Sequence, residues 1–395
     1  MISVDAALHA VLAHARPLDA VALPLAQALG RTLRRDARAD LDSPPFDASA
    51  MDGYAARRAD LAQTLRLIGE SSAGRGFAGA LGPGECVRIL TGAPVPAGVD
   101  CVVKQEDTAR DGDAVRVLHR DPATFIRRRG ENRRAGDLVV PAGTRLGPPE
   151  LAALASAGVA LPEVTRAPRC AHVVTGDELV APDRTPVGAQ IRDSNSTLIA
   201  ALLAQHGAEL VAQRALRDDL DGAAAALAEL PPHDMLLISG GASVGDHDIA
   251  RALLERAGYK LHFHGVDLRP GKPLLFAQRG ESLAFALPGN PVSHWVVFHL
   301  FLAPLLRFLE SGVATPLPRL TGRLGAGGRL PPTDRRHTFW PCRATIVDGH
   351  PELTPLALAS SGDAAGLVGA NALLPLPPAG SSFAPGQTVA FIPCP

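Results

Sequence analysis

Four loops rich in glycine or proline follow segments that the sequence predicts to be buried strands. The longest runs from Ser239 to Asp248 and carries two adjacent glycines, two serine hydroxyls and two acids. Free backbone N–H groups at Gly240 and Gly241, next to a helix N-terminus near Asp248, would cradle an anion. A tight strand-to-helix connection with Asp248 as its N-cap is the simpler alternative.

A second loop, Arg269-Pro270-Gly271-Lys272-Pro273, presents two cations three positions apart on a stiff backbone. Such a pair can clamp a small tetrahedral dianion. A solvated basic turn is the alternative. Lys272 favours the clamp, because the 395-residue chain has only three lysines among its 39 basic residues.

Acidic side chains stand in the same loops. Asp177 and Glu178 follow the first predicted strand of the α/β region, and Asp246 and Asp248 follow the third. Carboxylates converging on one crevice suit Mg²⁺ held together with a phosphate. Helix capping would explain two of these acids equally well.

The N-terminal half has two further polar loops. Ser49 to Ala55 places Asp52 beside a serine and a tyrosine, and Arg88 to Pro96 places Thr91 at a Gly/Pro turn. Each taken alone is typical of a structured loop. The arginine cluster between Arg127 and Arg134 indicates a solvated face.

Regular alternation of strand and helix patterns positions the loops of the C-terminal half. From Ala171 to Leu309 the sequence predicts strands near 171–174, 210, 235–238, 261–266 and 283–287, with helices at 196–206, 221–230, 249–257 and 292–309. This pattern indicates a doubly wound α/β domain. In such a sheet, ligands bind outside the carboxyl ends of the strands.

The rest of the chain differs in pattern. Residues 4–33 have helical spacing broken by Pro17 and Pro24, short β-type runs follow, and another helix is predicted from Pro149 to Gly158. We therefore expect a multidomain protein: a discontinuous N-terminal helical or mixed domain, an inserted β domain, the α/β domain and a C-terminal β domain, at residues 1–42 with 140–166, 43–139, 167–312 and 313–395.

Composition excludes several classes of protein. A net charge of −1 provides no general attraction for a polyanion, so nucleic acid is not an expected partner. The five cysteines form no C-x-x-C pair, which favours a reducing cytoplasm. Neither the N-terminus nor the apolar run from Trp295 to Leu306, interrupted by His299 and Pro304, predicts a membrane span.

Taken together, six motifs resemble the molybdopterin molybdenumtransferases, the family of bacterial MoeA and the gephyrin E domain. They occur in the same order over nearly the whole chain: Ser49–Ala55, Thr91–Pro96, Thr175–Leu179, Ser239–Gly245, Pro270–Pro273 and Leu287–Ser293. The resemblance implies a molybdopterin-binding α/β domain, a homodimer, and insertion of molybdate into adenylylated molybdopterin with release of AMP, assisted by Mg²⁺. Molybdoenzymes or chaperones are possible recipients of the finished cofactor.

The resemblance also implies site residues. Molybdate binding is expected at Ser243, Arg269, Lys272, Pro273, Arg336 and Ser361, catalytic roles at Asp52, Thr91, Glu178, Asp248 and Lys272, and metal binding at Glu178 and Asp248. Further substrate contacts are expected at Thr175, Gly176, Asp177, Ser194, Asn195, Ser239, Gly240, Gly241, Asp246, Pro270, Gly271 and Asn290. Arg269 stands where the family more often has lysine, which keeps the charge.

Two other functions remain open. A molybdopterin adenylyltransferase is similar in the α/β domain, although that resemblance leaves the Asp52 and Thr91 motifs and the C-terminal domain unexplained. A non-catalytic scaffold or cofactor-sensing protein of the same fold is the second alternative. The presence of Lys272, Asp248 and Glu178 together argues against a decayed site.

Overall fold

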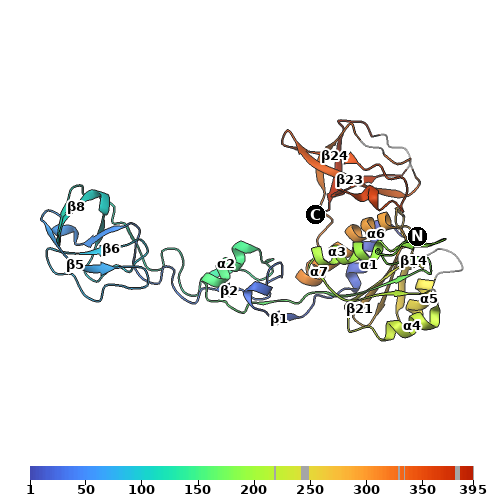
Figure 1. The fold of residues 1–395 in the computed structure, drawn as a ribbon, viewed down its shortest axis with the longest axis horizontal. Helices are drawn as coiled ribbons and strands as arrows, with labels where there is room; N and C mark the ends of the chain where they lie inside the picture. Colours follow the sequence, from blue (N-terminus) through green and yellow to red (C-terminus); the bar gives the residue numbers. More distant parts are fainter. Residues whose placement is uncertain (218, 242–248, 328–329, 333, 379–382, 395) are drawn as a thin grey trace. The chain divides into compact units, whose positions relative to one another are not determined.

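The computed structural model describes residues 1–395 except 218, 242–248, 328–329, 333, 379–382 and 395 (Figure 1). The chain folds as two compact units. The smaller unit is Ala22–Val164, and the larger unit joins Met1–Val21 to Thr165–Pro395. The chain leaves the larger unit through β1 (Ala20–Ala22) and returns through β12 (Glu163–Thr165).

A six-stranded sheet with the order β7-β4-β6-β5-β9-β8 dominates the smaller unit. Gly53, on a central strand, must be a glycine, because a Cβ there would lie 1.9 Å from the Val103 carbonyl oxygen. The strands are β4 (Gly53–Ala56), β5 (Leu65–Ser71), β6 (Glu85–Ile89), β7 (Cys101–Lys104), β8 (Thr108–Asp111) and β9 (Ala114–Val117). The β runs predicted near 87–90 and 114–118 correspond to β6 and β9.

Shorter elements complete the smaller unit. Helix α2 (Pro148–Ser156) begins with proline, whose missing N–H is tolerated in a first turn, and matches the predicted helix. The remaining elements are strands β2 (Ala37–Arg38), β3 (Ala48–Ser49), β10 (Ile126–Arg127) and β11 (Leu138–Val140), and 3-10 turns at Leu25–Gln27, Arg58–Asp60 and Gln105–Asp107.

The central sheet of the larger unit has the order β16-β13-β17-β21-β20-β18. Four strands are parallel: β16 (Glu209–Leu216), β13 (Arg169–Thr175), β17 (Met235–Ser239) and β21 (Ser282–Leu287). Strand β20 (Leu275–Arg279) is antiparallel to both β21 and β18 (Lys260–His264). Strand β18 therefore runs with the parallel strands, and the loop that follows it lies at their carboxyl edge.

Helices cover both faces of this sheet (Figure 1). Helices α4 (Leu220–Ala228) and α5 (Ile249–Arg256) pack on one face, in a core with Leu236 and Ala284. Helices α1 (Val4–His14), α3 (Asn195–Gln205), α6 (Pro291–Val297) and α7 (Ala303–Ser311) pack on the other, with Leu237 and Phe285. Burial on both faces explains why β13, β17 and β21 are almost continuously apolar. The doubly wound α/β class is thus confirmed.

One helical run joins α6 to α7 through a π-helical segment, Phe298–Leu302. Its 21 residues, Pro291–Ser311, are long and apolar enough to cross a membrane by length and composition, but 89% of the most apolar window is buried inside the protein. Burial of this kind is the property of a core helix.

A second six-stranded sheet, β19-β23-β24-β22-β26-β25, forms the C-terminal part of the larger unit, with an additional pairing of β23 with β25. Its first strand, β19 (Leu268–Arg269), belongs in sequence to the α/β domain and pairs with β23. The other strands are β22 (Leu320–Leu324), β23 (His337–Val347), β24 (His350–Pro355), β25 (Ala372–Leu376) and β26 (Thr388–Pro393), and a 3-10 turn spans Ala365–Leu367.

The observed elements differ from the expected ones in three places. Residues 4–33 are helical only as far as His14, apart from one 3-10 turn, because Pro17 and Pro24 hold the following chain extended. Strand β20 was missed, since its apolar residues follow directly on the Pro-rich loop. A short pair, β14 (Leu179–Val180) with β15 (Ile191–Arg192), was not predicted either.

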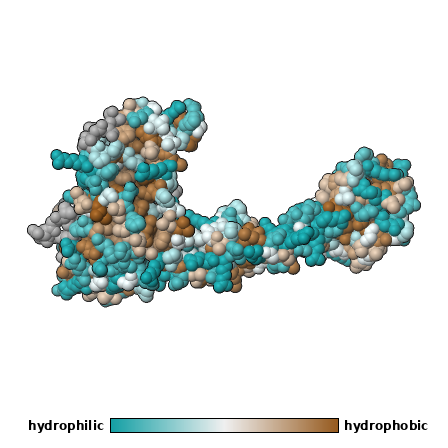
Figure 2. All heavy atoms as spheres, turned by 180° about the vertical axis from the view of Figure 1, so that it is seen from behind, coloured by the Kyte–Doolittle hydropathy of each residue, from teal (hydrophilic) through white to brown (hydrophobic). Residues whose placement is uncertain are grey.

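On the face drawn in Figure 2, hydrophilic and hydrophobic residues are interspersed over both units.

Candidate functional site

A cavity of about 770 Å³ opens in the larger unit, where the carboxyl edge of the α/β sheet meets loops of the C-terminal sheet. Its charged lining residues, among those the structure describes, are three cations. The cavity brings together eight of the residues expected from the sequence: Arg269, Pro270, Gly271, Lys272, Pro273, Asn290, Arg336 and Ser361.

The Arg269–Pro273 loop connects β18 to β20 and projects both of its cations toward this cavity. Gly271 has φ +122°, and a Cβ there would lie 2.9 Å from side-chain atoms of Leu268 and Val297. Arg269 is fixed from the other side, since β19 pairs it with Thr338 of β23. The loop is therefore held by both sheets.

The three cations have different partners. The guanidinium of Arg336 makes two hydrogen bonds to the Asp334 carboxylate, at 3.0 and 2.8 Å, and Arg269 Nη1 lies 3.5 Å from Asp334 Oδ2. Hydrogen bonds from the Arg336 side chain and backbone hold the pKa of Asp334 far below its usual range. Among the described residues, none pairs with the half-buried Lys272, which leaves its ammonium group available to an anion.

Ser361 reaches the cavity because its loop is tied to the start of α6. Asn290 Nδ2 donates to Ser361 Oγ at 2.8 Å, and the Val292 N–H donates to the Ser361 carbonyl at 3.1 Å. These two hydrogen bonds join the Leu287–Ser293 motif of the α/β domain to the C-terminal sheet. The Asn290 and Ser361 side chains thus lie together on one wall.

The expected nucleotide side lies at the carboxyl ends of β13 and β17. Gly240, at φ +87°, approaches so closely that a Cβ would lie 2.4 Å from the Thr175 carbonyl oxygen. Asn195 Nδ2 donates to the Gly289 carbonyl at 2.7 Å. Gly241 and Gly176 also have positive φ, Asp177 and Glu178 are exposed, and Ser194 is the N-cap of α3.

Two buried oxygen atoms on this side, Thr175 Oγ1 and Asn195 Oδ1, have no hydrogen-bond partner among the described residues. The carboxylate of Glu178 folds over Gly176, where a Cβ would lie 2.6 Å from Oε2. Carboxylate, hydroxyl and amide oxygens are the hard donors that Mg²⁺ takes. The donor set therefore fits magnesium. Within the described residues, no group of three or more His, Cys, Asp or Glu side chains is arranged so that it could hold a metal ion.

Three expected residues, Ser243, Asp246 and Asp248, lie outside the described residues.

Ser239 differs from its expected role as a substrate contact, since its side chain is fully buried. Its hydroxyl lies 2.7 Å from Nε2 of His172 and 2.7 Å from Nε2 of His294. His172 Nδ1 lies 3.0 Å from Gln213 Nε2, and His294 Nδ1 lies 3.1 Å from the Asn290 carbonyl oxygen. These five residues form one hydrogen-bonded chain, in which His172, Ser239 and His294 are buried and the two ends, Gln213 and Asn290, are exposed.

The two ends of this chain fix the protons along it. The Asn290 carbonyl only accepts, so His294 carries its proton on Nδ1 and accepts the Ser239 hydroxyl proton at Nε2. Ser239 then accepts from His172 Nε2–H, and His172 Nδ1 accepts from the Gln213 amide. Both imidazoles are neutral in this arrangement, and burial lowers the pKa of His172 to about 3 and that of His294 to about 4.

In the smaller unit, Asp52 and Thr91 are brought together although the sequence separates them. Both the backbone N–H and the hydroxyl of Thr91 donate to Asp52 Oδ1 at 2.7 Å. These two hydrogen bonds, the backbone one first, lower the pKa of Asp52. Asp52 is therefore an exposed carboxylate held ionised and in a fixed orientation.

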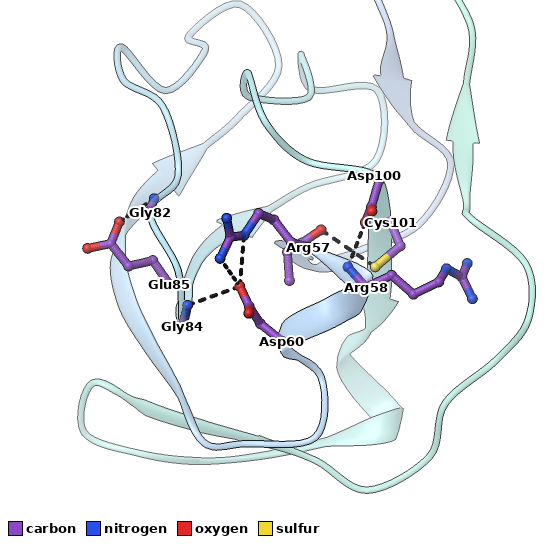
Figure 3. Close-up of polar contacts among 9 residues, drawn as sticks. Arg57, Arg58, Asp60, Gly82, Gly84, Glu85, Asp100 and Cys101 are labelled. Carbon is purple, nitrogen blue, oxygen red and sulfur yellow. Dashed lines mark hydrogen bonds and ion pairs between the residues drawn. The ribbon is translucent and has the colours of Figure 1, made fainter.

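Other carboxylates of this unit have structural partners. Figure 3 shows Asp60 accepting hydrogen bonds from Arg57 and from the Gly84 N–H, at 2.8 and 3.0 Å, and Asp100 accepting from the Arg58 N–H. The arginine cluster near Arg127 is likewise partly paired, with Arg128 on Asp47 and Arg129 on Asp42. These contacts agree with its interpretation as a solvated face.

Sequence reasoning missed Asp334, His172, His294 and Trp340, which lines the cavity. His172 was visible only as one polar residue within an apolar strand. Asp334 stands two positions before Arg336, and these opposite charges in the sequence could have indicated an ion pair.

Comparisons with known proteins cover nearly the whole chain. Family models match residues 2–158 (MoeA N-terminal region, domains I and II), 171–307 (probable molybdopterin binding domain) and 323–394 (MoeA C-terminal region, domain IV). A molybdopterin molybdenumtransferase from Nostoc sp. is 34% identical over 95% of this chain and 89% of its own length. One from Bacillus subtilis is 31% identical over 98% and 93%.

Solved structures give the same result. A molybdopterin biosynthesis MoeA protein from Pyrococcus horikoshii is 27% identical, with a TM-score of 0.81 and coverage of 100% of this chain and 99% of that one.

Proposed function

This chain belongs to the MoeA family of molybdopterin molybdenumtransferases, and from that premise we propose that it inserts molybdate into adenylylated molybdopterin with release of AMP. Its role is a step of molybdenum cofactor biosynthesis. The observation that carries the proposal is the cavity in which Arg269, Lys272 and Arg336 converge.

The cavity suits a tetrahedral oxyanion. Two guanidinium groups offer paired N–H donors, and Lys272 adds a compact charge from a backbone held by Gly271. Asn290 and Ser361 add neutral donors on the adjoining wall. Holding the oxyanion beside the organic substrate is a positioning contribution, which lowers the entropic cost of reaction.

The carboxyl ends of β13 and β17 suit the nucleotide and pyrophosphate. The Gly240–Gly241 backbone can approach a phosphate closely, because neither residue has a Cβ. Glu178 would hold Mg²⁺, with Asp248 as the second ligand that the resemblance implies. When bound, magnesium neutralises charge that develops on the departing phosphate. Thr175, at the end of β13, and Asn195, at the start of α3, would orient the nucleotide part of the substrate.

We further propose a homodimer, in which Asp52 and Thr91 act on the nucleotide side of the reaction. The Thr91 hydrogen bonds support this role, since they fix an ionised carboxylate at the surface. A cytoplasmic location is supported by five free, buried cysteines. Molybdoenzymes or their chaperones would receive the product.

The match to all three regions favours this function over its alternatives. A molybdopterin adenylyltransferase would account only for the part matched at residues 171–307. A scaffold without catalysis would not require a half-buried Lys272, which pairs with none of the described residues, in a cavity with two arginines.

The test is release of AMP from adenylylated molybdopterin. Purified protein should release AMP only when molybdate and Mg²⁺ are both present, and the product should reconstitute an apo-molybdoenzyme. AMP release without any dependence on molybdate would refute the transferase assignment.

A further inference from the structure

Two of the cations that line the cavity, Arg269 and Arg336, contact a carboxylate of the chain, that of Asp334, which does not itself line the cavity. Asp334 Oδ2 lies 2.8 Å from Arg336 Nη2 and 3.5 Å from Arg269 Nη1, so one carboxylate oxygen faces both guanidinium groups. The second oxygen accepts from Arg336 Nε at 3.0 Å and from the Arg336 backbone N–H at 2.9 Å. Two of the three cations lining the cavity thus share the single negative charge of Asp334.

Arg269 does not depend on Asp334 for its orientation. Its Nη1 also donates to the Pro332 carbonyl at 2.8 Å, and its backbone is part of β19. Asp334 is also incompletely buried, with 22% of its side chain exposed, so its carboxylate can leave the guanidinium groups without opening a core. The arrangement therefore permits exchange of one anion for another.

A carboxylate and a molybdate oxygen use the same N–H donors of a guanidinium group. An incoming oxyanion that uses the N–H groups of Arg269 and Arg336 facing Asp334 competes with the carboxylate already there. Even where the two share the donors, the negative charge of Asp334 repels a dianion at short range.

We propose that Asp334 sets the affinity of the oxyanion site, its carboxylate pairing with Arg269 and Arg336 until the oxyanion displaces it. This inference rests on the proposed function, which places the oxyanion in this cavity. Removing the charge of Asp334 while keeping an acceptor oxygen should tighten oxyanion binding. A residue that served only to orient Arg336 would have the opposite effect, since its loss would weaken binding.

The experiment compares Asp334→Asn with the wild-type full-length protein, by calorimetric titration with sodium molybdate and by the molybdate dependence of AMP release. We expect the dissociation constant and the half-saturating molybdate concentration to fall by about tenfold or more, because a hydrogen bond to a charged group contributes about 1.5 kcal/mol or more. Asp334→Ser, which leaves no amide, should shift both values in the same direction.

Asp267→Asn is the matched control. Asp267 precedes β19 and faces His337 at 3.4 Å, so this change removes a neighbouring carboxylate that has no ion pair to either arginine. Asp267→Asn should leave the dissociation constant and the half-saturating molybdate concentration within about twofold of the wild-type values. Thermal melts of all variants show whether each is folded.

The outcomes distinguish failure of this inference from failure of the proposed function. If wild-type protein binds molybdate and releases AMP, but both Asp334 variants bind molybdate equally or more weakly, Asp334 does not set the affinity and the proposed function stands. If the Asp267 variant binds as tightly as the Asp334 variants, the effect is one of general charge and the inference is overturned. Wild-type protein that neither binds molybdate nor releases AMP overturns both.

Discussion

The hydroxyl of Ser239 lies 2.7 Å from Nε2 of His294, at full burial, directly beneath the glycine loop of the site. This contact joins the end of β17 to the start of α6. Through His172 on one side and the Asn290 carbonyl on the other, it connects β13 and β17 to the loop before α6 in one chain of hydrogen bonds. Both imidazoles in this hydrogen-bonded chain are neutral, so protonation at low pH would disrupt it.

Acid should destabilise the α/β domain through these two histidines. Their folded pKa values, about 3 and about 4, lie below the ordinary 6.5, so the unfolded chain binds more protons once the pH falls below 6.5. Stability is thus fully present above pH 6.5 and is lost as the pH falls toward 4. Each histidine should lower the free energy of unfolding by about 2 kcal/mol when the pH falls from 7 to 5.

The measurement is urea unfolding at pH 7 and 5, followed by fluorescence of Trp295, the neighbour of His294. His294→Gln should reduce the loss of unfolding free energy by about 2 kcal/mol relative to wild type. His350→Gln, at an exposed position of β24, should not change it. An unaltered pH dependence in the His294 variant would show that this imidazole is protonated in the folded protein.

Lys272→Ala should weaken the use of molybdate and leave nucleotide binding intact. A lost hydrogen bond to a charged group costs about 1.5–3 kcal/mol, so the half-saturating molybdate concentration should rise roughly tenfold or more. Lys260→Ala, an exposed lysine at the start of β18, is the control. Equal molybdate dependence in all three proteins would remove Lys272 from the oxyanion site.

Glu178→Gln should slow AMP release by about tenfold or more, with partial recovery at high Mg²⁺, because the amide is a weaker magnesium ligand than the carboxylate. The comparison is Glu209→Gln at the opposite end of the sheet, which should behave as wild type. Normal turnover of the Glu178 variant at low Mg²⁺ would leave that residue a structural role only.

Asp52→Ala and Lys272→Ala test whether the two residues act within one subunit. If the homodimer shares its sites, mixing the two variants at a molybdate concentration too low for Lys272→Ala to turn over yields, under subunit exchange, heterodimers with one intact site. AMP release should then recover toward half of the wild-type rate per heterodimer. No recovery, with exchange confirmed by a tag, would mean that each subunit completes its own site.

The sequence alone was sufficient for the features that depend on local pattern. Alternating strand and helix periods identified the α/β domain, because a strand buried on both faces must be largely apolar, as 235–238 is. Glycine and proline marked the loops at the sheet edge, and the order of six motifs led to the family. The Arg269–Lys272 clamp followed from charge and spacing within five residues.

Tertiary structure decided which distant groups meet. Strand β19 pairs Arg269 with β23, and this register places Asp334 between two arginines that the sequence treated as free. The position of Ser239, facing inward between two histidines, depends on which strands are neighbours in the sheet. Such pairings arise from the packing of the whole domain, so residue type and spacing could nominate Ser239 and Arg269 but could not determine what their side chains contact.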